Sequence, residues 1–195
     1  MGRITKPSHL LAGEFRASPW RTAAALTAGK TMIVGRRMRV RGVRNITGRS
    51  GFLTLGTHYY GFADTRSNGL IRVRGKLIVG GNAHIGQGNR WDIGEQAVVS
   101  VGHGSYFSPD TVLVSSTGIT VGSNCAISWQ CQFLDDDFHT FIIGGTEQPR
   151  TAAITLGDNI WIGIRCIVLK GTRIANGCVI AANNTVTAPL TSRIV

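Results

Sequence analysis

The sequence predicts an all-β protein whose chain winds into stacked coils, each built from three short strands. The main evidence is a six-residue period near the C-terminus. An aliphatic residue returns at every sixth position, at Leu156, Ile162, Val168, Ile174, Ile180 and Val186. An α-helix repeats about every 3.6 residues and a flat strand about every two, so neither explains this period. Stacked coils do, because each aliphatic side chain then lies above its predecessor in one continuous core.

A second repeat extends the coils upstream. An aliphatic–glycine pair recurs at Val34-Gly35, Leu55-Gly56, Val79-Gly80, Val101-Gly102, Val121-Gly122 and Leu156-Gly157. The first four intervals between these glycines are 20 to 24 residues long, and the last is 35. Glycine suits a corner because it accepts backbone conformations that side chains disfavour. The long interval predicts a loop that leaves the coil near residues 140–153, where Gly144, Gly145 and Pro149 interrupt the repeat.

The length of 195 residues suits one domain. We expect residues 1–30 to cap the coil and residues 31–195 to form the β-helix domain. Arg16 and Arg21 interrupt the most apolar part of the N-terminus, so a secretory signal is not expected. No apolar stretch approaches the ~18 residues of a membrane span. The sequence therefore predicts a cytoplasmic protein.

The four cysteines occupy one recurring place. Cys125, Cys131, Cys166 and Cys178 all stand fifth in their six-residue repeats. Small residues share this place, which predicts a slot that points into the coil, where free cysteine packs as a small apolar residue. The chain has no Cys-x-x-Cys pair, and so no sign of zinc or redox chemistry.

Positive charge is concentrated in the N-terminal part. Residues 1–76 hold 15 Lys and Arg against two acids, and residues 77–195 hold 6 against 8. Arg37, Arg39 and Arg41 alternate with apolar residues, as do Arg72 and Arg74, so neighbouring strands should present a ladder of cations. One interpretation is a solvated strand surface that discourages edge pairing. The other is attraction to an acidic polysaccharide, a lipid-linked pyrophosphate or the membrane surface. Nucleic acid is not expected, because no aromatic residues interleave with the arginines.

His139, which stands where the predicted loop begins, is the strongest candidate for chemistry. In an extended chain Asp135, Asp137 and His139 lie on the same side. A carboxylate beside the imidazole would fix its tautomer and prepare the other ring nitrogen as a general base. The alternative is that the acidic residues only cap a corner. Trp161 is a second candidate, because an exposed indole can stack on a sugar or an acyl carrier arm; packing under the loop or against another subunit is its alternative.

The stretch Leu156 to Gly163 resembles the Ile-Gly-Asp-Asn-Val-Trp-Ile-Gly signature of the hexapeptide-repeat acyltransferases. Residues 125–139 resemble the active-site coil of the bacterial branch that includes polysaccharide O-acetyltransferases. The resemblance implies a left-handed parallel β-helix and a homotrimer with active sites between subunits. It also implies acetyl-CoA as donor, a hydroxyl of a sugar or surface polysaccharide precursor as acceptor, and no metal. The basic N-terminal third suggests an acceptor that is anionic or lipid-linked, or a peripheral contact with a membrane.

The resemblance also assigns residues. His139 is the expected general base, held by Asp137 or Asp135, and Trp161 lies beside the thioester. The expected contacts to the donor arm are Gly163, Ile164, Ala181 and Ala182. We expect a main-chain N–H near Trp161 or Gly163 to stabilise the oxyanion. Relatives often carry a lysine at Ala188 that faces the donor phosphates, so Arg165, Lys170 or Arg193 is expected to substitute.

Two other functions stay open. A catalytically silent coil could bind an anionic partner through its arginines. A γ-type carbonic anhydrase would share the fold, but it needs three zinc-binding histidines at each subunit interface. The chain has no histidine pair at short regular spacing, so a metal is not expected.

Overall fold

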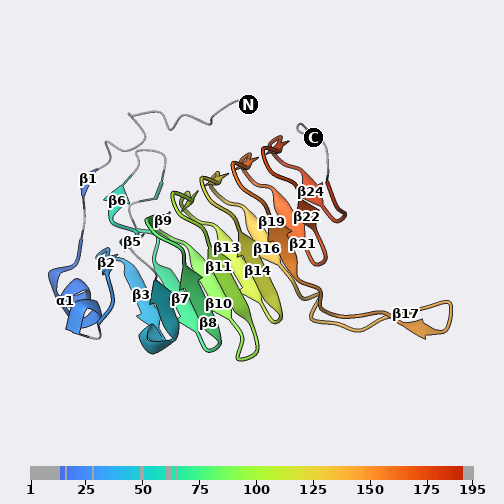
Figure 1. Ribbon diagram of the computed structural model, residues 1–195, viewed down its shortest axis with the longest axis horizontal. Helices are drawn as coiled ribbons and strands as arrows, with labels where there is room; N and C mark the ends of the chain where they lie inside the picture. The colour runs from blue at the N-terminus through green and yellow to red at the C-terminus, as the bar shows by residue number, and fades with distance from the viewer. Residues whose placement is uncertain are drawn as a thin grey trace.

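The computed structural model describes residues 14–15, 17–27, 29–48, 51–59, 63–64 and 66–190. Much of the predicted capping segment 1–30 and the candidate Arg193 therefore lie outside the described residues. In Figure 1 the chain runs from α1 at one end through a row of stacked coils, and one hairpin projects far from the stack.

Three parallel sheets form the walls of the coil, and each turn of the chain adds one strand to each wall. The first wall consists of β2 (Met32–Val34), β5 (Leu53–Leu55), β9 (Ala83–Ile85), β12 (Tyr106–Phe107), β15 (Ala126–Ile127), β20 (Trp161–Ile162) and β23 (Val179–Ile180). The second consists of β3 (Met38–Arg41), β7 (Gly69–Val73), β10 (Arg90–Ile93), β13 (Val112–Ser115), β16 (Gln132–Leu134), β21 (Ile167–Leu169) and β24 (Thr185–Val186). The third consists of β4 (Ile46–Gly48), β8 (Lys76–Val79), β11 (Val98–Val101), β14 (Gly118–Val121), β19 (Ile154–Leu156) and β22 (Arg173–Ile174). The predicted all-β parallel β-helix is confirmed.

One helix, a short strand pair and a 3₁₀-helix lie at the N-terminal end. The helix α1 (Pro19–Thr27) packs its buried Ala25 into the core, and the Arg21 guanidinium donates to the Arg36 carbonyl at 2.6 Å. Strands β1 (Glu14–Phe15) and β6 (His58–Tyr59) form a short antiparallel pair, and a 3₁₀-helix, η2 (Val43–Asn45), joins β3 to β4. Helix α1 thus covers the first coil, while the domain boundary at residue 30 stays a prediction.

The six-residue repeat builds the core. All six aliphatic residues of the C-terminal repeat are buried, and Ile162 lies directly beside Ile180 in neighbouring strands. In the middle coils three aromatic rings fill the interior edge to face, with centroid distances of 4.7 Å for Trp91–Phe107 and 6.0 Å for Phe107–Phe133. The four cysteines are free and buried, as predicted, and burial raises the pKa of the Cys131 thiol to about 12.

The corner between the first and second walls repeats one backbone conformation. Its residues with positive φ are Gly88, Asp110, Gln130, Arg165 and Asn183. The N–H groups of the last four donate to a carbonyl of the previous coil; the Arg165 N–H, for example, donates to the Trp129 carbonyl at 3.1 Å. This repeated corner places Ile164 and Arg165 directly after the strand that holds Trp161.

The projecting hairpin, called the arm below, comprises residues 138–151. It leaves the coil between β16 and β19, at the corner of the second and third walls (Figure 1). Its strands β17 (Ile142–Ile143) and β18 (Thr146–Glu147) pair antiparallel across a turn at Gly144 and Gly145, which both have positive φ. The predicted loop near residues 140–153 is confirmed as this arm. The trimer stays a prediction.

The aromatic stack gives a test of the core. Phe107→Ala should lower the free energy of unfolding by about 3–5 kcal/mol, because the cavity lies between two rings that cannot collapse into it. Chemical denaturation measures the change. The exposed Val98 is the control, and Val98→Ala should change stability by less than about 0.5 kcal/mol. Equal effects of both substitutions would contradict this account of the core.

Candidate active site

His139 lies exposed at the root of the arm, five residues after β16 ends at Leu134. Its Nδ1 atom lies 3.4 Å from the main-chain carbonyl oxygen of Asp137. When Nδ1 carries the proton it donates to this carbonyl, and Nε2 then has a free lone pair. The imidazole is therefore oriented by the backbone of the arm root and not by a carboxylate.

Asp135 does not reach His139, so the predicted contact with the imidazole is wrong. Its carboxylate is fully buried and accepts four hydrogen bonds from the previous coil's corner between β13 and β14. The donors are the Ser115 hydroxyl and the main-chain N–H groups of Ser116, Thr117 and Gly118. The predicted common side fails because the chain is not extended: Phe138 has a φ of 60° and turns the backbone. The alternative, an acidic residue that caps a corner, describes Asp135.

Asp137 is also engaged elsewhere, since its Oδ2 atom lies 2.6 Å from the Lys170 Nζ atom. Lys170 stands at the corner of the next coil, and its ammonium also donates to the Pro149 carbonyl on the returning strand of the arm. The predicted contact of the Asp137 carboxylate with the imidazole is therefore not made within the described residues. The role of Lys170 toward donor phosphates stays a prediction.

Asp136 is buried at the arm root and joins the two ends of the arm to the previous coil. Its carboxylate accepts from the Ser116 hydroxyl and the Phe138 N–H, each at 2.7 Å, and pairs with the Arg150 guanidinium at 3.0 Å. Burial pushes the pKa of Asp136 up, but these hydrogen bonds and the charges of Arg150 and Lys170 together hold it below its ordinary value. The carboxylate is thus ionised at neutral pH. Sequence analysis missed Arg150; its only signal was a cation that ends the loop opposite three acids.

Trp161 lies on the outward face of the first wall and is 49% exposed. Its indole N–H donates to the Ser128 hydroxyl at 3.3 Å. Gly163 follows at the corner, where a Cβ atom would lie 2.7 Å from the Ala182 nitrogen, so only glycine fits there. Ala181 and Ala182 are exposed beside it on the next coil. The structure therefore brings four of the predicted donor-arm residues together at one corner.

Two further expectations at this corner have different outcomes. The N–H of Trp161 donates to the Cys178 carbonyl and that of Gly163 to the Ile180 carbonyl, at 3.0 and 2.9 Å. Because both donors belong to the coil ladder, these two N–H groups are not available to an oxyanion. Stabilisation by another main-chain N–H near this corner stays a prediction. The Arg165 guanidinium donates to the Gln130 side chain at 2.9 Å and is otherwise exposed, so its contact with phosphates stays a prediction.

His139 and Trp161 lie on different walls of the coil. His139 follows β16 at the corner of the second and third walls, whereas Trp161 belongs to β20 on the first wall. No hydrogen bond or ring contact joins the two side chains within the described residues. A single copy of the chain thus keeps the two candidate groups apart.

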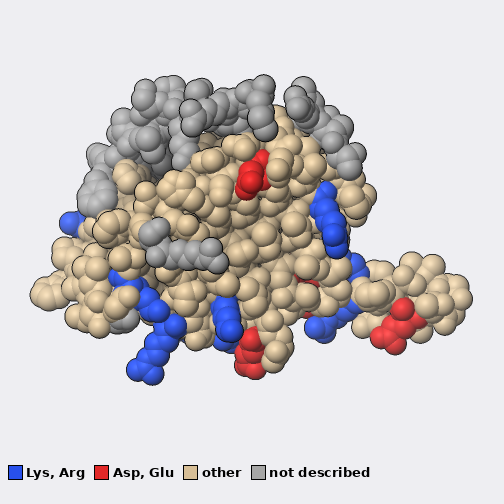
Figure 2. Space-filling model, in the orientation of Figure 1, with Lys and Arg blue, Asp and Glu red and all other residues tan. Residues whose placement is uncertain are grey.

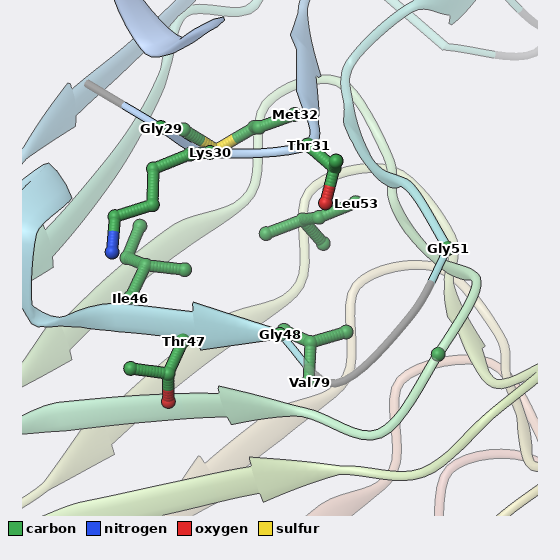
Figure 3. Close-up of a pocket in the computed structure, with 11 residues that line it drawn as sticks. Gly29, Lys30, Thr31, Met32, Ile46, Thr47, Gly48, Gly51, Leu53 and Val79 are labelled. Carbon is green, nitrogen blue, oxygen red and sulfur yellow. The ribbon is translucent and has the colours of Figure 1, made fainter.

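Two hollows lie away from both residues. One, of about 450 Å³, lies on the outward face of the second wall, where Arg39, Arg41, Arg72 and Arg90 surround Leu70, Val112 and Val114. The other, of about 170 Å³, lies at the N-terminal end, between the first and third walls; Figure 3 shows Lys30, Thr31 and Thr47 around it. On the face drawn in Figure 2, basic side chains are spread around the coil stack and acidic ones are few.

Within the ranges that the structure describes, no three His, Cys, Asp or Glu side chains gather in a way that could hold a metal ion. Over the same residues, no helix has the length and apolar character needed to cross a membrane.

No family model matches the chain. A Klebsiella pneumoniae protein named "Uncharacterized 24.8 kDa protein in cps region" is 31% identical over 134 residues, which are 68% of this chain. The match covers 60% of that protein, so the chain spans less than two thirds of this curated relative.

Among solved structures, the polySia specific acetyltransferase NeuO is 16% identical, with a TM-score of 0.49 over 82% of this chain and 79% of that one. A variant of AntD, an N-acyltransferase from Bacillus cereus in complex with dTDP and Coenzyme A, is 14% identical. Its TM-score is 0.45, over 91% of this chain and 83% of that one.

The buried carboxylate of Asp135 predicts a structural effect. Asp135→Ala should lower the free energy of unfolding by about 3 kcal/mol or more, because one buried hydroxyl and three partly buried N–H groups lose their acceptor at once. Denaturant unfolding measures this, with Glu147→Ala on the exposed arm as the control of near-zero effect. A variant with full stability but no activity would instead make Asp135 a partner of the chemistry.

The lowered pKa of Asp136 predicts a pH-dependent arm. A carboxyl whose pKa is lowered on folding stabilises the fold above its unfolded pKa, about 3.9, and this contribution is lost as pH falls through the lower folded value. Hydrogen exchange at Asp137 and Phe138, corrected for intrinsic rates, should therefore speed up as the pH falls below the unfolded pKa and through the lower folded one. Asp136→Asn should already exchange fast at neutral pH, whereas slow exchange in this variant would contradict the ion pair's role.

Proposed function

We propose that the chain is an acetyl-CoA-dependent O-acetyltransferase that acts on a hydroxyl of a sugar or a surface polysaccharide precursor. The observation that carries this proposal is the exposed imidazole of His139, whose Nδ1 faces a main-chain carbonyl at a root fixed by two ion pairs. Such an imidazole presents Nε2 as a base in a fixed direction. A general base must point an unprotonated nitrogen at the hydroxyl proton that it removes.

The opposite half of the site is the corner beside Trp161. Its exposed indole and the close packing of Gly163 on Ala182 leave a flat, side-chain-poor surface along the coil. A thin acyl carrier arm could lie along such a surface. The curated relative is named for a cps region, which supports a surface polysaccharide precursor as acceptor.

In the proposed reaction His139 takes the proton of the acceptor hydroxyl on Nε2. The oxygen then forms a bond to the thioester carbonyl carbon, the carbon–sulfur bond breaks, and the imidazolium returns its proton to the departing thiolate. The Asp137 carbonyl stabilises the imidazolium through Nδ1–H, in the role that we expected of a carboxylate. Since the Trp161 and Gly163 N–H groups are occupied, oxyanion stabilisation comes from other groups.

The separation of His139 from Trp161 supports a site shared between copies. If one copy places its first wall beside the arm root of the next, the imidazole and the indole face the same acceptor and donor. A closed ring with three equivalent sites, the predicted homotrimer, satisfies this arrangement. The cytoplasmic location expected from the sequence belongs to the same proposal.

Removing the base tests the chemistry. His139→Ala should lower kcat by about 10²–10⁴ without changing the fold, measured by mass spectrometry with acetyl-CoA and an acceptor found by screening surface glycan precursors. The exposed His103 is the control, and His103→Ala should keep full activity. Normal turnover by His139→Ala would contradict the proposal, and no binding of acetyl-CoA in isothermal titration would favour a silent scaffold.

Mixing variants tests the shared site. His139→Ala and Trp161→Ala should each be nearly inactive alone. Co-refolded in equal amounts, they should recover activity in about a quarter of the sites, because one copy supplies the imidazole and the next the indole. No recovery, with mixed oligomers shown by native mass spectrometry, would place both groups in one copy.

A further inference from the structure

The second wall carries a group of arginines on its outward face near the N-terminal end. Register places Arg41 beside Arg72 and Arg72 beside Asp92, in one row across three strands. A second row holds Arg39, Leu70 and Arg90. Neighbouring strands lie about 4.8 Å apart, so the cations of each row are fixed at short, regular distances.

These arginines are only partly neutralised. Asp92 accepts from the Arg72 Nε atom at 2.9 Å and pairs with Arg74 at 3.4 Å. The hydrogen bonds from Arg72 hold the pKa of Asp92 below its ordinary value, so both partners are charged at neutral pH. Arg39, Arg41 and Arg90 have no ion pair with any described residue. Three guanidinium groups thus remain available to an anion from outside.

The arginines surround the hollow of about 450 Å³ on this wall, called the arginine hollow below. Leu70, Val112 and Val114 line it and are half-buried. Arginine forks match carboxylates in two-point hydrogen bonds, and aliphatic side chains can pack against the C–H faces of sugar rings. The hollow therefore combines sites for repeated carboxylates with an apolar surface.

The hollow lies on the same wall as the arm root. The row that begins at Arg41 continues through Val114 to Leu134, the last residue of β16. Three strand steps separate β7 from β16, which is about 14 Å. A chain molecule held in the arginine hollow could therefore extend across β13 to the corner where His139 stands.

We infer that the arginine hollow binds an acidic polysaccharide through its carboxylates; its direction toward His139 rests on the proposed function, but the binding itself does not. A membrane fits less well, because the most exposed large apolar side chains of the described residues, Trp20, Ile142 and Ile143, are not among those that line it. Nucleic acid fits less well, because the only aromatic side chain lining it, Trp91, is buried and offers no stacking surface.

Polygalacturonate, a carboxylated polysaccharide, is the probe, and neutral dextran is its control. Isothermal titration without acetyl-CoA should show that the full chain binds polygalacturonate and not dextran. Arg39→Glu/Arg90→Glu should weaken binding at least tenfold, because each lost charged contact is worth about tenfold. Lys76→Glu/Arg173→Glu changes the charge equally on the exposed third wall and should weaken binding less than about twofold.

Four results would overturn the inference. Equal loss in both double variants would show unspecific charge attraction, and equal affinity for dextran would remove the role of carboxylates. Tighter binding to phosphatidylserine vesicles or duplex DNA, lost in Arg39→Glu/Arg90→Glu, would assign the surface to that ligand. A changed oligomeric state of this variant in sedimentation would make the wall a contact between copies.

His139→Ala separates this inference from the proposed function. This variant should bind polygalacturonate as the unchanged chain does while its acetyl transfer is lost. If polygalacturonate does not bind but His139→Ala still abolishes transfer, only the arginine hollow's role is wrong. If polygalacturonate binds and His139→Ala transfers acetyl groups normally, the role of the arginine hollow is supported and the proposed role of His139 is wrong.

Discussion

The constraint on which this structure depends is the register of its parallel coils. Each strand must repeat the path of the strand beneath it, so that ladder hydrogen bonds form and aliphatic side chains stack without gaps. An insertion within a wall would shift every later residue out of its layer. Extra chain can therefore leave only at a corner, where the arm departs between β16 and β19. The position of His139 follows from this rule, because the arm root is where the register is interrupted and restored.

Three consecutive acidic residues fix the arm root, where the register is restored, and each binds a different part of the chain. Asp135 holds the corner of the previous coil, Asp136 holds the returning strand of the arm through Arg150, and Asp137 holds the next coil through Lys170. Each of the three carboxylates is engaged in a structural contact, and none of them contacts the imidazole of His139. What remains for His139 is a main-chain carbonyl in a backbone that these contacts fix. This carbonyl favours the tautomer that carries the proton on Nδ1, because only that tautomer can donate to it.

Much of the fold and part of the candidate site could be predicted from the sequence. The period from Leu156 to Val186 fixed the layers, and the buried slot of the cysteines followed from it. The use of Asp135 and Asp137 could not be predicted in the same way. Their prediction assumed an extended chain, whereas the backbone turns at Phe138 and neighbouring coils supply partners for the carboxylates. Where the repeat is interrupted, patterns in the local sequence no longer predict the backbone conformation, because contacts between coils determine it.

The inner faces of the three walls are alike, whereas their outer faces differ. The third wall presents small polar residues, such as Ser100 and Thr120, which hydrogen-bond to each other. The first presents Trp161, and the second presents arginines followed by an aliphatic row. Since most residues of the core are apolar, the outward side chains are the ones that distinguish the three walls and can contact ligands. Side chains on two walls of one copy face different directions, which is why the proposed site combines His139 of one copy with Trp161 of the next.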